Sequence, residues 1–258
     1  VGIRPSDTVF DPACGTGGFL IGALNRMIHE QGLTYEEAID RARHNVFGIE
    51  VEPTTAALCV TNMILRGDGK SGILRANCFT ELNYPPQKVS VALLNPPFPH
   101  KQNRAQKPAS AFIDRAILSV QDRGLIAAVV PYSLLSKADS WHKAILKNHT
   151  VKFIATLPAD LFNPYSNYDT ALIVIQKGVP HRDGKTFFAR VNNDGYKIKK
   201  TNRVLKPGGG SQLPQLLEAY NDKTEIPEFT AFRVLSTTSE EWAPETFIES
   251  AAHNDDEF

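Results

Sequence analysis

Apolar runs of strand length alternate with helical spacings over the first 176 residues. Thr8–Asp11 is a short apolar run that leads into a turn, and the next segment repeats apolar residues on one helical face, at Leu20, Leu24, Met27 and Ile28. Further strands are predicted at Val46–Val51, Ile73–Ala76, Val89–Leu94, Leu125–Val130, Val151–Leu157 and Ala171–Gln176. Further helices are predicted at Thr34–His44, Thr54–Leu65, Ala111–Val120 and Ser140–Lys147.

This alternation favours a doubly wound (Rossmann-like) α/β fold with a mainly parallel sheet, because parallel neighbours need a helical crossover between them. No helix is evident between Val151–Leu157 and Ala171–Gln176. We therefore expect an antiparallel strand at this point of an otherwise parallel sheet.

The pattern changes beyond Gly178. The apolar run Phe187–Val191, the turn signal Asn193-Asp194-Gly195 and the glycines at 208–210 predict a hairpin and a loop, and Leu213–Tyr220 predicts a short helix. The chain is accordingly divided into a main domain, residues 1–180, and a small C-terminal extension, residues 181–258, that holds the hairpin, a basic stretch and an acidic end.

Composition is that of an ordinary globular protein: 258 residues, 42% hydrophobic and 22% charged. No apolar run approaches the roughly 20 residues of a membrane span, and we expect no membrane association. The three cysteines, Cys14, Cys59 and Cys78, have no CxxC spacing, which argues against a disulfide framework or a bound metal. These features predict a cytoplasmic protein.

A formal net charge of zero conceals an uneven distribution. Seven acidic and no basic side chains lie between Glu240 and Phe258, so residues 1–239 carry a net charge of +7. A basic body can contact a polyanion, whereas the acidic end would be repelled by one. Basic candidates for such a contact are His100, Lys101, Arg104, Lys107, Lys197, Lys199, Lys200, Arg203 and Lys206.

A glycine-rich turn, Asp11-Pro12-Ala13-Cys14-Gly15-Thr16-Gly17-Gly18, joins the first strand to the first helix. Glycines allow close approach of a ligand to the backbone, and the carboxyl ends of strands form the ligand crevice of doubly wound sheets. Glu50 ends the second strand, where a carboxylate can accept both hydroxyls of a ribose. The alternative is a plain turn with a solvated glutamate. The spacing does not fit the dinucleotide fingerprint G-x-G-x-x-G.

Asn95-Pro96-Pro97-Phe98 follows directly on the apolar run Val89–Leu94. Two prolines stiffen the loop and end the strand. The Asn95 side chain and the Pro96 carbonyl then form two fixed acceptors suited to a planar amino group, and Phe98 offers a flat face for its ring. The alternative is a strand-ending turn with a core phenylalanine.

Taken in order, these motifs resemble the N6-adenine DNA methyltransferases, and most closely the modification (methylase) subunit of type I restriction–modification systems. The sequences Asn62-Met63-Ile64-Leu65-Arg66-Gly67, Thr156-Leu157-Pro158-Ala159 and Asn193-Asp194-Gly195-Tyr196 are also similar to that family, so the resemblance covers about residues 5–220. It implies a methyltransferase fold for residues 1–180 and methyl transfer from S-adenosylmethionine to adenine N6 of a base flipped out of the duplex.

The resemblance also implies roles for single residues. It assigns the cofactor to Asp11, Pro12, Ala13, Cys14, Gly15, Thr16, Gly17, Glu50, Asn77 and Cys78, with Asn77, Cys78 and Phe79 at its adenine moiety. It assigns the reaction to Asn95, Pro96, Pro97 and Phe98. The chain departs from the family in having Asn77 where an aspartate is usual, and a cofactor motif upstream of the glycine turn is missing from a sequence that starts at Val1. Phe162, Tyr165 and Tyr168 are candidates for the target pocket, with core packing as the alternative.

No segment resembles a target-recognition domain, so the resemblance implies DNA, a specificity subunit and a restriction subunit as partners. Two alternatives stay open. Methyltransferases of RNA or of protein glutamine amides also use an Asn-Pro-Pro-aromatic loop, and a non-catalytic assembly module could keep the fold without the cofactor.

Overall fold

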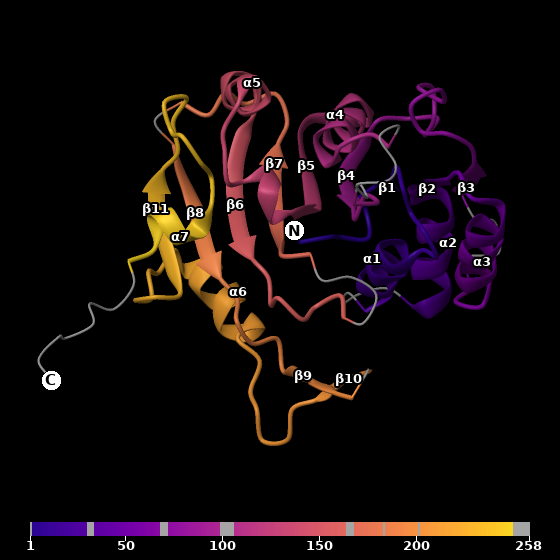
Figure 1. Cartoon of the computed structure of the whole chain (residues 1–258). Coiled ribbons are helices and arrows are strands. Elements are labelled where there is room, and N and C mark those ends of the chain that lie inside the picture. The colour runs from indigo at the N-terminus through magenta and orange to yellow at the C-terminus, as the bar shows by residue number, and fades with distance from the viewer. Residues whose placement is uncertain are drawn as a thin grey trace, which may run out of the picture. The chain divides into compact units, whose positions relative to one another are not determined.

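The structure is a computed structural model and describes residues 2–29, 34–67, 72–98, 106–163, 168–182, 184–200 and 202–249 (Figure 1). The chain forms two compact units. The first comprises residues 1–129 and 174–179, and the second comprises residues 130–173 and 180–258. The sequence analysis divided the chain differently, into a main domain and a C-terminal extension at residue 180, and that division stays a prediction.

The first unit holds five neighbouring parallel strands. They are β1 (Val9–Asp11), β2 (Val46–Glu50), β3 (Gly72–Arg75), β4 (Val89–Leu94) and β5 (Val120–Pro131), in the order β5-β4-β1-β2-β3. Because β1 lies between β2 and β4, the strand order reverses at β1. This reversal is the switch point at which doubly wound sheets bind ligands beyond the strand carboxyl ends. The predicted fold is confirmed.

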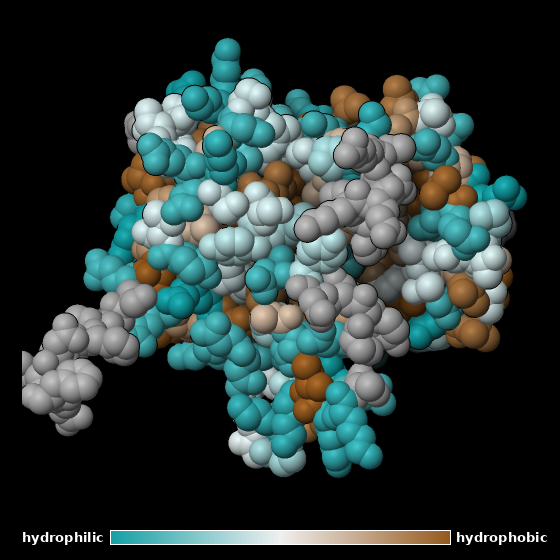
Figure 2. Space-filling model, viewed as in Figure 1, coloured by the Kyte–Doolittle hydropathy of each residue, from teal (hydrophilic) through white to brown (hydrophobic). Residues whose placement is uncertain are grey.

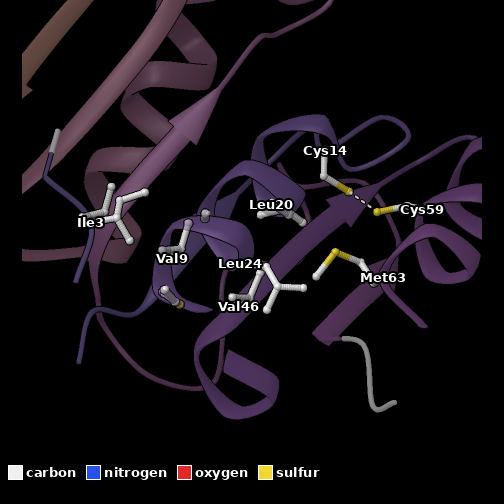
Figure 3. Close-up of a cluster of buried hydrophobic side chains, with 11 residues drawn as sticks. Ile3, Val9, Cys14, Leu20, Leu24, Val46, Cys59 and Met63 are labelled. Atoms are coloured by element: carbon white, nitrogen blue, oxygen red, sulfur yellow. Dashed lines mark hydrogen bonds between the residues drawn. The ribbon is translucent and has the colours of Figure 1, made fainter. Parts of the chain in front are cut away.

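Helices pack on this sheet through the alternation of side chains along each strand. The helices of the first unit are α1 (Gly18–Ile28), α2 (Tyr35–Asn45), α3 (Pro53–Ile64) and α4 (Ala109–Ser119). Val9 lies in a buried cluster with Leu20 and Leu24 of α1 (Figure 3). The next residue, Phe10, points to the other side of the sheet, where its ring lies 5.3 Å from the guanidinium of Arg115 in α4. Helices therefore cover both faces.

The second unit holds β6 (Thr150–Thr156), β8 (Lys185–Arg190) and β11 (Thr230–Val234), and β7 (Thr170–Gln176) begins in it. β6 and β8 pair in parallel, and β11 pairs with β8 antiparallel. The sheet is therefore mainly parallel with an antiparallel strand, but this strand is β11, which was not predicted from the sequence. An antiparallel orientation at Val151–Leu157 or Ala171–Gln176 stays a prediction. The helices of the second unit are η1 (Tyr132–Leu134), α5 (Ser140–Asn148), α6 (Leu213–Asp222) and α7 (Pro244–Phe247).

A hairpin is present in this part of the chain, but it is not the predicted one. Phe187 and its neighbours form β8, which pairs with β6 and β11, whereas β9 (Tyr196–Lys199) pairs antiparallel with β10 (Asn202–Leu205). The expected hairpin closed by Asn193–Gly195 is therefore wrong. The turn itself is present: the Asn193 side chain accepts a hydrogen bond from the Gly195 N–H at 3.0 Å, but the turn leads into β9.

The part of the acidic end that the structure describes is packed, not free. The indole of Trp242 is fully buried, and its ring centroid lies 4.5 Å from that of His142 in α5. Asp255, Asp256 and Glu257 lie outside the described residues. Among the described residues, no helix has the length and apolar character needed to cross a membrane.

Candidate functional site

The glycine-rich turn is fixed to β2 and to α3. The Cys14 N–H donates to the Ile49 carbonyl at 2.9 Å, and the Asn62 side chain donates to the Thr16 carbonyl at 3.0 Å. Gly17 has a φ of 90°, and a Cβ added there would lie 2.8 Å from Sγ of Cys59. Both the backbone conformation and the close contact require glycine at this position. The helix α1 begins at the next residue.

Two carboxylates lie at this turn. Glu50 accepts a hydrogen bond from the Gly15 N–H at 3.0 Å through Oε2 and one from the Glu52 N–H at 2.9 Å through Oε1. Asp11 is only 2% exposed and accepts one from the Ala13 N–H at 2.9 Å. Burial raises the pKa of Asp11 to about 7, and the nearby charge of Glu50 adds to this effect. A cation beside Asp11 would favour its ionised form.

The segment after β3 forms the wall opposite the turn. The Ala76 N–H donates to the Glu50 carbonyl at 3.0 Å, which holds the segment beside β2. The Asn77 side-chain oxygen accepts from the Phe79 N–H at 3.0 Å. The ring of Phe79 meets that of Phe112 in α4 edge to face, with centroids 4.8 Å apart. The wall thus offers an apolar aromatic surface beside polar backbone groups.

The Asn95–Phe98 loop follows β4, the strand on the other side of β1. Asn95 and Pro97 are exposed, Pro96 is buried and Phe98 is half-buried. Since β4 adjoins β1 at the switch point, the loop emerges at the same edge of the sheet as the glycine-rich turn.

These segments enclose a cavity of about 520 Å³ that lies wholly within the first unit. It is within the size range of small-molecule sites. The predicted site residues that line it are Pro12, Ala13, Gly15, Glu50, Asn77, Cys78, Phe79, Asn95 and Pro97. The predicted residues that do not line it are Asp11, Cys14, Thr16, Gly17, Pro96 and Phe98. Lining residues to which the sequence analysis gave no site role are Ile49, Val51, Ala76, Gln106 and Phe112.

Cys14 lies beneath the turn, in the core that Figure 3 shows, and its Sγ lies 3.8 Å from Sγ of Cys59. The contact with Cys59 and burial both raise the pKa of the Cys14 thiol, so the thiol stays protonated. Its side chain therefore packs in the core, and Cys14 can approach a ligand only through its backbone.

Arg115 is a site-supporting residue that the sequence analysis missed. This 2% exposed side chain donates to the carbonyls of Cys78 at 2.5 Å, Glu81 at 2.9 Å and Tyr84 at 2.5 Å. It also contacts the Ser119 hydroxyl. One arginine on α4 therefore fixes the wall segment that carries Cys78. The signal in the sequence is a lone arginine on an otherwise apolar helix face.

The remaining candidates are those predicted for contact with a polyanion or for the target pocket. Lys107 lines the cavity, with its Nζ 6.0 Å from the centroid of the Phe79 ring. His100, Lys101, Arg104 and Tyr165 lie outside the described residues. Phe162 and Tyr168 belong to the second unit, and their role at a target pocket stays a prediction. Among the described residues, no cluster of His, Cys, Asp and Glu side chains could hold a metal ion.

Fold and cavity define a doubly wound α/β domain with a small-molecule site at its switch point. The N-6 DNA methylase family matches residues 3–247, and the chain belongs to this family.

Among relatives, the chain is 35% identical over 212 residues to the type II restriction enzyme and methyltransferase RM.BcgI of Heyndrickxia coagulans. It is 27% identical over 218 residues to the type I restriction enzyme EcoEI methylase subunit of Escherichia coli. Each match covers 78% of this chain, but only 32% of the first relative and 44% of the second. The chain therefore spans less than half the length of these two relatives.

Solved structures agree on the fold. The type I restriction–modification methyltransferase subunit from Streptococcus thermophilus aligns with a TM-score of 0.67 at 20% identity, over 90% of this chain and 51% of that one. The type I restriction enzyme EcoKI M protein aligns with a TM-score of 0.62 at 21% identity, over 76% of this chain and 46% of that one. The predicted methyltransferase fold is confirmed.

Proposed function

We propose that the chain is the catalytic part of a DNA methyltransferase that transfers a methyl group from S-adenosylmethionine to adenine N6. The observation that carries the proposal is a single cavity lined by Gly15 and Glu50 on one side and by Asn95 and Pro97 on the other. Such a cavity brings a cofactor-binding turn and a group that can hold an amino nitrogen within reach of one another.

The chemistry of the cavity fits S-adenosylmethionine. Its α-ammonium group and its sulfonium carry positive charge, and Asp11 and Glu50 supply two carboxylates at the turn. Glu50 keeps acceptor capacity on both oxygens beyond its bonds to Gly15 and Glu52, as a ribose diol requires. Phe79 and Phe112 provide a flat apolar wall for an adenine ring. When bound, S-adenosylmethionine supplies an electrophilic methyl group.

The residues of the chain then act on the target base. Asn95 accepts a hydrogen bond from the exocyclic amine through its side-chain oxygen, and Pro96 accepts a second one through its carbonyl. Two acceptors draw electron density onto a nitrogen that is otherwise conjugated with the ring, and Phe98 stacks on that ring. Rate acceleration would come from positioning and electrostatic stabilisation, because no group of the chain needs to become covalently attached.

We propose further that the chain works with DNA-recognition and restriction partners. The support is that relatives are named as methylase subunits of type I restriction enzymes. A specificity subunit would choose the DNA site, and a restriction subunit would use the same recognition. We place this assembly in the cytoplasm, where the DNA substrate of such systems lies.

The experiment identifies the methylated product. The protein, assembled with its partner subunits, is incubated with methyl-labelled S-adenosylmethionine and DNA lacking N6-methyladenine, and the nucleosides are separated by liquid chromatography and mass spectrometry. Asn95→Ala is expected to lower the rate at least about 10²-fold, the contribution of a positioned hydrogen-bonding group. Asn25→Ala, which replaces an exposed asparagine on α1, is the matched control.

Each alternative has its own outcome in this experiment. Label found in RNA or in a protein glutamine amide, and not in DNA, would identify that molecule as the substrate. Absence of transfer to all three acceptors, together with absence of cofactor binding, would identify a non-catalytic module. Unchanged activity in Asn95→Ala would refute the proposed mechanism.

A further inference from the structure

The ribbon of β9 and β10 is a two-stranded antiparallel element outside the cavity, and it carries the second group of basic residues that the sequence analysis named for contact with a polyanion. Tyr196 pairs with Leu205 and Lys199 with Asn202 across its length. Figure 1 shows the ribbon extending away from the β6, β8 and β11 strands of the same unit. An isolated two-stranded ribbon is marginally stable by itself, so its attachment to the unit needs an explanation.

The base of the ribbon is tied down by Arg203. Its guanidinium forms two bonds to the Asp194 carboxylate, at 2.8 and 2.9 Å, and reaches Asp160 at 3.4 Å. It also lies 5.5 Å from the centroid of the Tyr196 ring. On the neighbouring segment, the Gln212 side chain accepts from the Asn193 N–H at 2.8 Å. The ribbon is therefore a positioned element, and Arg203 is neutralised by its own unit.

Four further cations, three at the ribbon and Lys206 directly after it, have no such partner. Lys197, Lys199, Lys200 and Lys206 are exposed, and no ion pair engages them within the part of the chain that the structure describes. The sequence has no acidic residue between Asp194 and Glu218. Four uncompensated positive charges thus lie within ten residues.

The two faces of the ribbon differ. Directly opposed residues share a face. Tyr196, Leu205 and Ile198 therefore lie on one face together with the ion-paired Arg203, and Lys197 and Lys199 lie on the other with Val204 and Asn202. The three apolar side chains are 45%, 69% and 43% exposed. Figure 2 shows a brown apolar patch between teal hydrophilic residues in this part of the molecule. A positioned element that leaves both its apolar and its cationic side chains exposed is a surface for a partner.

We propose that this ribbon binds the phosphate backbone of duplex DNA through Lys197, Lys199, Lys200 and Lys206, a proposal that rests on DNA being the substrate. Charge favours this partner, because four cations without a nearby acid match a regularly spaced polyanion. A protein partner would use the apolar face and would not need the lysines.

The test measures the binding of the chain to a fluorescein-labelled 30-base-pair duplex of arbitrary sequence by fluorescence anisotropy, from 50 to 200 mM salt. One variant changes Lys197, Lys199, Lys200 and Lys206 to Gln. The matched control changes Lys137, Lys143, Lys185 and Lys223 to Gln, four other exposed lysines of the same unit. Both variants lose the same net charge, and thermal melts establish that both are folded.

For the ribbon variant, we expect affinity at 50 mM salt to fall at least about tenfold and the slope of log K against log salt to become shallower by about 3 to 4, the effect of four lost phosphate contacts. The control should keep the wild-type slope. An equal loss in both variants, an unchanged ribbon variant, or absence of wild-type binding at 50 mM salt would each overturn the proposal. Cofactor binding, measured separately, reports on the proposed function, so its failure is distinguishable from failure of the ribbon.

Discussion

Glu50 and Gly15 are 35 residues apart in the chain and are joined by a 3.0 Å hydrogen bond from the Gly15 N–H to Oε2 of Glu50. This bond connects the carboxyl end of β2 to the glycine-rich turn that follows β1. It orients a carboxylate at the mouth of the cavity before any ligand arrives. Preorganisation of this kind lowers the ordering cost of binding.

Burial of Asp11 makes the stability of the ligand-free chain depend on pH. Its pKa in the folded state, about 7, lies above its unfolded value of 3.8, so the folded state binds more protons between these values. Stability is therefore lost as pH rises from about 4 to about 7, by at most roughly 4 kcal/mol. Asp11→Asn, which mimics the protonated carboxyl, should be more stable than the wild type at pH 8 and equally stable at pH 4. Urea unfolding at both pH values checks this. A difference in the free energy of unfolding between Asp11→Asn and the wild type that is the same at pH 4 and pH 8 would contradict it.

The same carboxyl should link cofactor binding to proton release. A positively charged ligand favours ionised Asp11, so below pH 7 binding must displace a proton. We expect the affinity for S-adenosylmethionine to fall up to tenfold for each pH unit below about 7. Calorimetry at pH 6 in two buffers of different ionisation enthalpy should give a release of about one proton. Identical binding enthalpies in the two buffers would show that no proton is released and would contradict this prediction.

Alanine substitutions at Gly15 and Gly17 should distinguish the cost of backbone strain from the cost of a steric clash. Both have positive φ, 56° and 90°, but a Cβ at Gly15 would meet nothing within 4 Å, whereas one at Gly17 would lie 2.8 Å from Sγ of Cys59. Gly15→Ala should cost about 1 kcal/mol of stability through its backbone conformation. Gly17→Ala adds overpacking and should cost about 2 to 4 kcal/mol. Chemical denaturation of the two variants measures both losses of stability. A greater loss for Gly15→Ala than for Gly17→Ala would contradict this prediction.

Replacing Arg115 should loosen the cavity wall. Arg115→Met keeps most of the side-chain volume but leaves the carbonyls of Cys78, Glu81 and Tyr84 without their donor. Loss of these bonds should cost about 2 to 4 kcal/mol of stability. We expect amide hydrogen exchange to rise in residues 76–84 beyond the rise elsewhere. Exchange that stays at the wild-type level in this segment would show that Arg115 does not hold it.

The motifs and the main elements could be predicted from the sequence because their signals are local. The alternation of apolar runs with helical spacings predicted β1 to β7, and turn chemistry drew attention to Gly15, Gly17 and Asn95. Features that depend on distant contacts could not be predicted. The role of Arg115 arises only when α4 packs against the segment after β3. β11 and the partners of β8 are set by pairing across the sheet, which the turn at Asn193–Gly195 does not determine.

The most direct test of the central proposal is a calorimetric titration of the chain with S-adenosylmethionine at pH 8, in parallel with Asp11→Ala and Asn95→Ala. The first variant alters the turn and the second alters the proposed catalytic loop. We expect saturable binding by the wild type, binding within a few fold of it by Asn95→Ala, and loss of binding by Asp11→Ala. Wild-type affinity in Asp11→Ala would contradict the placement of the cofactor at the glycine-rich turn.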